Sequence, residues 1–313
     1  MLPCVLLFLF ILCVPVSHNN NEIEKMAQKS EDVNKMNGEN KDTLRVAFAG
    51  TEGAYASIAA KKMFPNVKPL SCPDFIDAYR GTETGHYDYA VLPIENSYAG
   101  EVGTVTDLMF SGSLHINRVI SLPIRHALIV NPRAENNEIK TVVSHPQALM
   151  QCAVFIKENH CKVIESPSTS HAAKYVKESG RRDIAAIASE EAAQEFGLTV
   201  LQKEINDSSG NTTRFAAFSR TQNTDTDSEN CNFSIIFTVE NKAGALLEPL
   251  RIIAKHGYNM RCLRSRPLKN TVWCYYFYIE AEGNINSEDG QKMLAELDGA
   301  CEELKLIGSY RAD

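Results

Sequence analysis

The stretch YAVLPIENS, residues 89–97, decides the fold, because an apolar run passes directly into the polar turn Glu95-Asn96-Ser97. Short apolar runs that end in turn residues are typical of buried strands. Similar runs begin at residues 141, 162 and 184, and each is followed by a segment of helical periodicity. This alternation predicts an α/β fold with a largely parallel sheet between residues 44 and 220.

The pattern changes after a polar linker at residues 221–231. Strand patterns follow at 233–239, 260–266, 273–280 and 304–310, and helical patterns at 245–255 and 288–303. Their order, βαββαβ, is that of a ferredoxin-like domain. We therefore predict two domains, at 44–220 and 232–313, which suits a chain of 313 residues.

The composition excludes several classes of protein. A hydrophobic content of 44% and a charged content of 23% are ordinary for a globular chain. The net charge of −7 argues against a nucleic-acid binder, which usually carries a basic stripe. The nine cysteines are scattered without a C-x-x-C pair, so we expect reduced thiols rather than a zinc or redox motif. We expect no metal site.

The first 43 residues have a character of their own. Residues 2–16 form an apolar run that is short for a membrane span and resembles the hydrophobic part of a signal peptide. No Lys or Arg precedes it. Residues 17–43 are polar and lack aromatic residues, so we expect them to be disordered. Two interpretations stay open: a targeting segment at residues 1–16, or an internal start at Met26 or Met36.

Several polar motifs follow predicted strands, where ligands of open α/β sheets bind. They are the Gly50–Gly53 turn, Glu95-Asn96-Ser97, His145-Pro146-Gln147 and Ser168-Thr169. The turn points backbone N–H groups at whatever lies before the next helix. Each motif also has a structural explanation: glycines that the turn requires, ordinary turn residues, a structural histidine before a helix, and a helix N-cap at Ser168 or Thr169.

The segment Asn211-Thr212-Thr213-Arg214-Phe215 enters another strand and carries more chemistry. An Arg in this position can bind a carboxylate through two parallel hydrogen bonds. A neighbouring hydroxyl can donate to a reacting oxygen about 3 Å away, and the aromatic ring supplies a wall. The alternative is a loop with an exposed Arg. We favour one shared cleft, since several strand-end motifs fall within one predicted domain.

Taken in order, these motifs resemble the prephenate dehydratase family, including its plant-type arogenate dehydratases. The resemblance covers Leu44 to about Arg220 and continues in an ACT domain from Asn232 to Arg311. It rests on Gly-x-x-Gly-x-Tyr at 50–55, Pro-Ile-Glu-Asn-Ser at 93–97, His-Pro-Gln-Ala-Leu-x-Gln-Cys at 145–152, Ser-Thr at 168–169, Ala-Ile-Ala-Ser at 186–189, Asn-x-Thr-Arg-Phe at 211–215 and Ile-Gly-Ser-Tyr at 307–310.

The resemblance implies a two-lobed catalytic region like the type II periplasmic binding proteins, followed by a regulatory ACT domain. It implies a cofactor-free lyase that converts prephenate to phenylpyruvate on the route to L-phenylalanine, with Thr213 as the catalytic residue. Substrate contacts are expected from Gly53, Ala54, Tyr55, Glu95, Asn96, Ser97, Gln147, Ser168, Thr169, Asn211, Arg214 and Phe215. The alternatives are arogenate as the substrate, or a non-catalytic sensor of small anions. Thiol content and pathway favour the cytoplasm or the plastid stroma.

The ACT domain implies binding of L-phenylalanine and pairing into a homodimer or homotetramer. The regulatory residues would be Gly244, Ala245, Leu246, Arg264, Ser265 and Arg266. Three positions depart from the family pattern: Ala243 replaces a proline, Arg264 replaces the glutamate of Glu-Ser-Arg-Pro, and Ala56 replaces a common serine. An acid replaced by a base changes the charge by two, so we predict that phenylalanine at millimolar levels does not inhibit.

Overall fold

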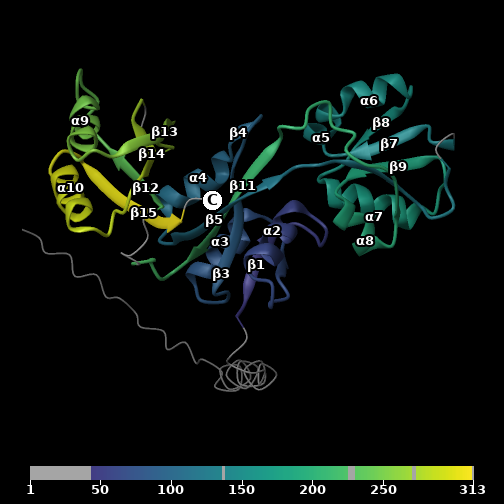
Figure 1. Ribbon diagram of the computed structural model, residues 1–313, viewed down its shortest axis with the longest axis horizontal. Coiled ribbons are helices and arrows are strands. Elements are labelled where there is room, and N and C mark those ends of the chain that lie inside the picture. Colours follow the sequence, from purple (N-terminus) through teal and green to yellow (C-terminus); the bar gives the residue numbers. More distant parts are fainter. Residues whose placement is uncertain (1–43, 136–137, 225–229, 270–272, 312–313) are drawn as a thin grey trace, which may run out of the picture. The chain divides into compact units, whose positions relative to one another are not determined.

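The computed structural model describes residues 44–135, 138–224, 230–269 and 273–311 (Figure 1). The predicted signal-like segment and polar tail lie outside these ranges. No helix within them is long and apolar enough to cross a membrane. The described strands form two sheets, one of ten strands and one of five.

The N-terminal part of the described chain supplies six strands of the first sheet. Its strands there are β1 (Val46–Ala49), β2 (Leu70–Cys72), β3 (Tyr89–Asn96), β4 (Gly100–Glu101), β5 (His115–Pro123) and β11 (Thr212–Ser219). Helices α2 (Tyr55–Met63), α3 (Phe75–Glu83) and α4 (Gly103–Ser111) pack against them. Strand β1 is parallel to β2 and β3, whereas β11 lies between β3 and β5 and is antiparallel to both.

The second sheet has the order β10-β6-β9-β7-β8. Its strands are β6 (Ala127–Val130), β7 (Thr141–Ser144), β8 (Lys162–Glu165), β9 (Ile184–Ala188) and β10 (Thr199–Gln202). Its helices are α5 (Pro146–Gln151), α6 (Ala153–Glu158), α7 (Thr169–Ser179) and α8 (Glu190–Phe196). The single helix predicted for 147–158 is interrupted at Cys152, whose backbone leaves the helical region (φ −123°, ψ 26°).

The prediction of a largely parallel sheet is wrong, because both sheets are mixed. Strands β6, β10 and β11 pair antiparallel with their neighbours. The chain crosses between the sheets twice, from β5 into β6 and from β10 back into β11. These crossing segments enter each sheet against the direction of the strands that alternate with helices.

The C-terminal region follows the predicted order βαββαβ. Its elements are β12 (Cys231–Thr238), α9 (Leu247–Lys255), β13 (Asn259–Pro267), β14 (Tyr275–Glu282), α10 (Glu288–Asp298) and β15 (Glu303–Arg311). The strands are antiparallel in the order β13-β14-β12-β15. Residues of both helices and of the strands share one apolar core, which includes Phe233, Ile253, Met293 and Leu297.

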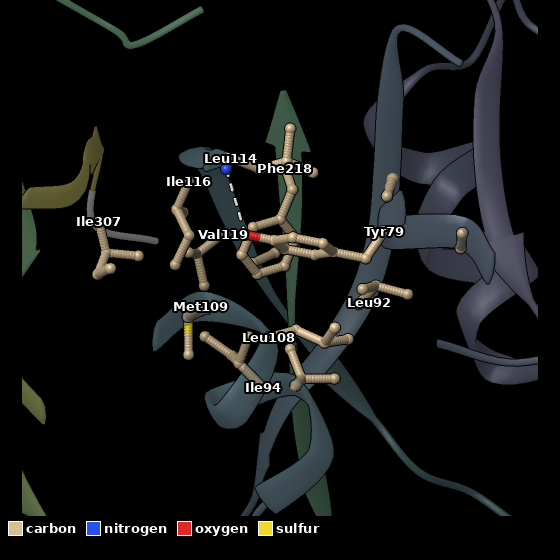
Figure 2. Packing of buried hydrophobic residues seen from close by; sticks show 14 of the residues in the cluster. Tyr79, Leu92, Ile94, Leu108, Met109, Leu114, Ile116, Val119, Phe218 and Ile307 are labelled. Atoms are coloured by element: carbon tan, nitrogen blue, oxygen red, sulfur yellow. Dashed lines mark hydrogen bonds between the residues drawn. The ribbon is translucent and has the colours of Figure 1, made fainter. Parts of the chain in front are cut away.

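Strand β15 joins the C-terminal strands to the N-terminal strands of the first sheet. It pairs parallel with β5 at Gly308 and Ile116. A Cβ at Gly308 would lie 2.1 Å from the carbonyl oxygen of Ile116, so this close approach requires glycine. One apolar core then extends across the junction: Figure 2 shows Ile307 and Ile116 in the cluster that surrounds Tyr79. The junction places β13 and β14 in contact range of the strands that carry the candidate site.

Candidate active site

The site is built on the ladder between β3 and β11. Thr213 lies opposite Asn96, and the next pair along the ladder is Arg214 with Glu95. Successive side chains of a strand point to opposite faces. The side chains of these two adjacent pairs therefore point to opposite faces of the sheet.

Asn96 determines the hydrogen-bonding role of Thr213. The Asn96 side-chain oxygen accepts from the backbone N–H groups of Tyr98 and Ala99, at 3.0 and 2.9 Å. These donors fix the orientation of the amide, so Nδ2 faces Thr213 Oγ1 at 2.9 Å. Because Nδ2 only donates, the Thr213 oxygen accepts in this bond and its own proton points elsewhere. The buried Thr213 hydroxyl is thus prepared as a donor.

The same amide begins a chain of neutral hydrogen bonds. Asn96 Nδ2 also donates to Asn211 Oδ1 at 2.8 Å, and Asn211 Nδ2 donates to Gln151 Oε1 at 2.9 Å. Gln151 Oε1 lies 3.0 Å from His126 Nε2, which must carry a proton to complete the pair. Since Gln151 is on α5 and His126 precedes β6, the chain links β3 and β11 to the second sheet. We call these residues the neutral chain: Thr213, Asn96, Asn211, Gln151 and His126.

His126 is the titratable member of the neutral chain. Burial lowers its pKa, and the hydrogen bond with Gln151 opposes this only in part. The imidazole is therefore neutral near pH 7, with Nδ1 3.3 Å from the Tyr55 hydroxyl. That hydroxyl donates to the carbonyl oxygen of Arg125 at 2.6 Å. Tyr55 is thus positioned by structural partners, and its burial raises the pKa of its phenol.

Three helix N-termini meet beside the Gly50–Gly53 turn. Thr51 Oγ1 donates to Ser170 Oγ in the first turn of α7 at 2.6 Å, and Ser189, the N-cap of α8, donates to the carbonyl oxygen of Gly53 at 2.9 Å. Gly53 has φ +79°, and a Cβ there would lie 2.8 Å from the Cα of Ala192. The turn itself leads into α2. Helix N-termini carry partial positive charge, so their convergence favours an anion.

Other predicted residues have identifiable positions. Ser168 is the N-cap of α7 and accepts from the His171 N–H at 3.1 Å, and Thr169 begins that helix. Ser97 Oγ donates to the Gly210 carbonyl at 3.1 Å and accepts from the Thr212 N–H at 3.0 Å. Ser168 therefore has the capping role that the sequence allowed, and Ser97 fixes the loop before Thr213.

One cavity of about 350 Å³ lies at the junction of the two sheets. Gln147 and Asn211, both predicted contacts, border it together with Gln151, Tyr98 and Met150. This places part of the neutral chain at the wall of a space that a small molecule can enter.

The next rung carries charge. Arg214 donates to both carboxylate oxygens of Glu280 on β14, each at 2.7 Å, and to Glu95 at 3.2 Å. Arg264 on β13 donates to the other oxygen of Glu95. Burial lowers the pKa of the Arg214 guanidinium, but the hydrogen bonds and charge of Glu280 outweigh burial and raise it. We call Glu95, Arg214, Glu280 and Arg264 the charged bridge.

Comparison with known proteins identifies the family to which this chain belongs. The family model described as prephenate dehydratase matches residues 46–223. A bifunctional chorismate mutase/prephenate dehydratase of Enterobacter agglomerans is 34% identical over 274 residues, which are 86% of this chain and 71% of the relative. The chain belongs to the prephenate dehydratase family.

Other members and structures agree with this family. Arogenate dehydratase/prephenate dehydratase 2 of Arabidopsis thaliana is 33% identical over 283 residues, 88% of this chain and 74% of the relative. The structure of an Arthrobacter aurescens prephenate dehydratase in complex with L-Phe has a TM-score of 0.80 and 28% identity, and covers 86% of this chain and 90% of its own. A structure titled as a novel type of quorum quenching acylase also has a TM-score of 0.80, with 30% identity and coverage of 86% and 98%.

Three of the predicted substrate contacts have other partners in the structure. Arg214 and Glu95 face the C-terminal strands instead of sharing a face with Thr213, because neighbouring strand residues point to opposite sides. Their charges are bound by Glu280 and Arg264. Phe215 is 2% exposed and lies in the apolar cluster with Val46 and Ile120, so it is a core residue.

The predicted regulatory residues fall in two places. Gly244 and Ala245 border a cavity of about 500 Å³ within the C-terminal region, and Leu246 packs against the adjoining core. Arg264, Ser265 and Arg266 lie on β13 instead. There Arg266 donates to Glu101 at 2.6 Å and to Asp107 at 3.0 Å. Arg264 and Arg266 thus contact β3, β4 and α4 in the N-terminal part of the described chain.

Sequence reasoning missed three residues of these networks. Gln151 lies within the quoted His-Pro-Gln motif, and its spacing of four from Gln147 gave a signal that could have been followed. His126 and Glu280 gave none: His126 lies in the segment before β6, Glu280 lies in β14, and the partner of each is distant in sequence.

Proposed function

We propose that this enzyme catalyses the decarboxylative dehydration of prephenate to phenylpyruvate, a step of L-phenylalanine biosynthesis, and that Thr213 is its catalytic residue. Family membership supports the reaction. The observation that carries the role of Thr213 is its bond from Asn96, which occupies the oxygen as an acceptor and directs the proton away.

The reaction asks little covalent chemistry of the protein. The bond from the ring to its carboxylate breaks, carbon dioxide leaves, and the electron pair moves through the ring to expel the hydroxyl group. That group takes up a proton and departs as water, and the ring becomes aromatic. A threonine hydroxyl is a weak acid, so Thr213 donates a hydrogen bond to the departing oxygen while solvent supplies the net proton. Such assistance contributes roughly 10²–10⁴ in rate.

Substrate binding is assigned to two sides of the site. The N-termini of α2 and α7, with backbone N–H groups near Gly53, Ala54 and Tyr55 and the residues Ser168 and Thr169, would hold a carboxylate. Gln147 and Asn211, which border the cavity, would contact the substrate from that side, and Asn96 and Ser97 would brace it. The meeting of the α2, α7 and α8 N-termini supports this assignment, because it offers a dianion compensating partial charges.

Turnover assays with two substrates test the proposal. Purified protein is incubated with prephenate or with arogenate, and phenylpyruvate and phenylalanine are separated by chromatography. We expect phenylpyruvate from prephenate. Phenylalanine formed from arogenate at the higher kcat/KM would replace prephenate as the substrate. Binding of either compound without turnover would instead favour a non-catalytic sensor.

We further infer a two-lobed catalytic region at residues 44–220, like the type II periplasmic binding proteins, a linker at 221–231 and an ACT domain at 232–313. An L-Phe complex is known for the Arthrobacter aurescens relative, which supports phenylalanine as a ligand here. The edge strand β13, with Met260 and Leu263 36% and 42% exposed, supports pairing with a second copy. Light scattering that finds a monomer would contradict the predicted homodimer or homotetramer.

A further inference from the structure

Two residues of the charged bridge, Glu95 and Arg214, form the rung next to the Asn96–Thr213 pair. Glu95 precedes Asn96 on β3, and Arg214 follows Thr213 on β11. Each charged residue thus shares a peptide bond with a member of the Asn96–Thr213 pair. The β3–β11 register shifts between Arg214 and Phe215, immediately beyond this rung. Such irregularities disrupt ladder pairing locally, so side chains must contribute to fixing the backbone here.

Both outer members of the bridge come from the C-terminal region. Glu280 is 1% exposed, and its carboxylate binds the Arg214 guanidinium through two parallel bonds of 2.7 Å. This bidentate geometry restrains the direction of the guanidinium as well as its distance. Arg264 binds Glu95 from the neighbouring strand β13. The two contacts hold the two ends of one rung.

A buried carboxylate stabilises a core poorly, because removing its charge from water costs free energy. Well-packed apolar residues of similar volume often give equal or better stability than a buried ion pair. The location of Glu280, beside the rung that follows Thr213, points to orientation instead. A displacement of about 1 Å at a reacting group can lower a rate by roughly 10²-fold.

We propose that Glu280 and Arg264 are positioning residues for the dehydration, supplied by the C-terminal region. They hold the Glu95–Arg214 rung and thereby the Asn96–Thr213 hydrogen bond. This inference rests on the proposed function, since it concerns the same reaction.

Kinetics of Glu280→Gln and Arg264→Met test the proposal in the full-length chain without phenylalanine. Glu280→Gln keeps the shape of the side chain and removes its charge. We expect kcat for prephenate to fall about tenfold in Glu280→Gln and less in Arg264→Met, with KM within about twofold of the wild-type value. Arg264→Lys keeps the charge opposite Glu95 and should recover most of the lost kcat.

Arg261→Met is the matched control. Arg261 lies on the same strand as Arg264 and borders the cavity of about 470 Å³ that the charged bridge also lines. It contacts Glu282 only at 3.7 Å, so its loss should leave kcat unchanged. Circular dichroism and thermal melting establish that each variant is folded. If Glu280→Gln does not fold, the Arg264 pair of variants decides.

Three results would overturn the proposal: wild-type kcat in a folded Glu280→Gln or Arg264→Met, an equal loss in Arg261→Met, or a change confined to KM. Absence of turnover in the wild-type protein would instead overturn the proposed function, so the two failures are distinguishable.

Discussion

The neutral chain and the charged bridge start from adjacent rungs of one ladder and differ in almost every physical respect. The neutral chain joins β3 and β11 to the second sheet through amides, a hydroxyl and a neutral imidazole. The charged bridge joins the same strands to β13 and β14 through two arginines and two carboxylates.

The difference separates two tasks. A side-chain amide donates through its nitrogen and accepts through its oxygen, so the neutral chain makes the Thr213 oxygen an acceptor and directs its proton elsewhere. The neutral chain also brings no charge near a dianionic substrate. Hydrogen bonds between charged groups are stronger than those between neutral groups, and the bidentate pair also restrains direction, which suits the charged bridge for holding a rung in place. Strand alternation keeps the charges on the far face.

The first prediction reverses the direction of the neutral chain at its origin. In Asn96→Asp, the carboxylate still accepts from the Tyr98 and Ala99 N–H groups but offers no donor to Thr213. The Thr213 proton would turn towards the introduced carboxylate, and a charge would face the substrate. We expect kcat to fall by a factor on the order of 10³, as for loss of a preorganised donor. Steady-state kinetics within about threefold of wild type would show that the amide direction is unimportant.

The second prediction breaks the charged bridge and measures stability. Glu280→Gln removes the buried carboxylate that binds the Arg214 guanidinium and leaves Glu95 as its carboxylate partner. Removal of one partner from a buried pair should lower the free energy of unfolding by about 3 kcal/mol. Urea denaturation measures the loss, with Arg261→Met as the reference. Equal urea midpoints for the two variants would mean that the charged bridge contributes no more stability than a weak surface ion pair.

The third prediction breaks the neutral chain at its midpoint. Gln151→Met removes the oxygen that accepts from Asn211 and His126, whereas Gln151→Glu keeps an acceptor for both. We expect Gln151→Met to lose about 2 kcal/mol of unfolding free energy, because two donors are left without a partner. Gln151→Glu should lose less by the same urea measurement. The reverse order would mean that packing, not hydrogen bonding, matters at this residue.

The fourth prediction concerns pH. Burial holds the pKa of His126 below its ordinary value near 6.5, so the unfolded chain binds a proton that the folded chain does not. Stability is therefore complete above about pH 6.5 and declines as the pH falls through the folded-state pKa. His115, whose pKa burial also lowers, adds to the decline. Urea midpoints between about pH 7.5 and 5.5 should fall less in His126→Gln than in wild type, and identical slopes would count against a neutral His126.

The fold could be predicted from the sequence where periodicity is local. The strand–helix order at residues 141–196 and the βαββαβ order of the C-terminal region are both present in the structure. Short strands such as β4 and β10, and the antiparallel position of β11, were not predicted. Pairing direction depends on where the chain crosses between sheets, and no local pattern records that.

The candidate site shows the same division. Asn96, Asn211 and Thr213 come together because Asn96 ends β3 and the 211–213 segment enters its antiparallel neighbour β11. Arg214 was assigned to the substrate because adjacency in a motif was taken as a shared face, whereas in the structure Glu280 binds its guanidinium. Glu280 is 66 residues away in the sequence, so no local pattern could pair the two residues.

The most direct test of this account compares Thr213→Ser with Thr213→Val. Serine keeps the hydroxyl that accepts from Asn96 and donates to the departing group, whereas valine keeps the volume and loses the hydroxyl. With prephenate as substrate, we predict that Thr213→Ser stays within about tenfold of the wild-type kcat and that folded Thr213→Val is slower by roughly 10²–10⁴. Equal kcat values for the two variants would contradict the role of Thr213 as the donor.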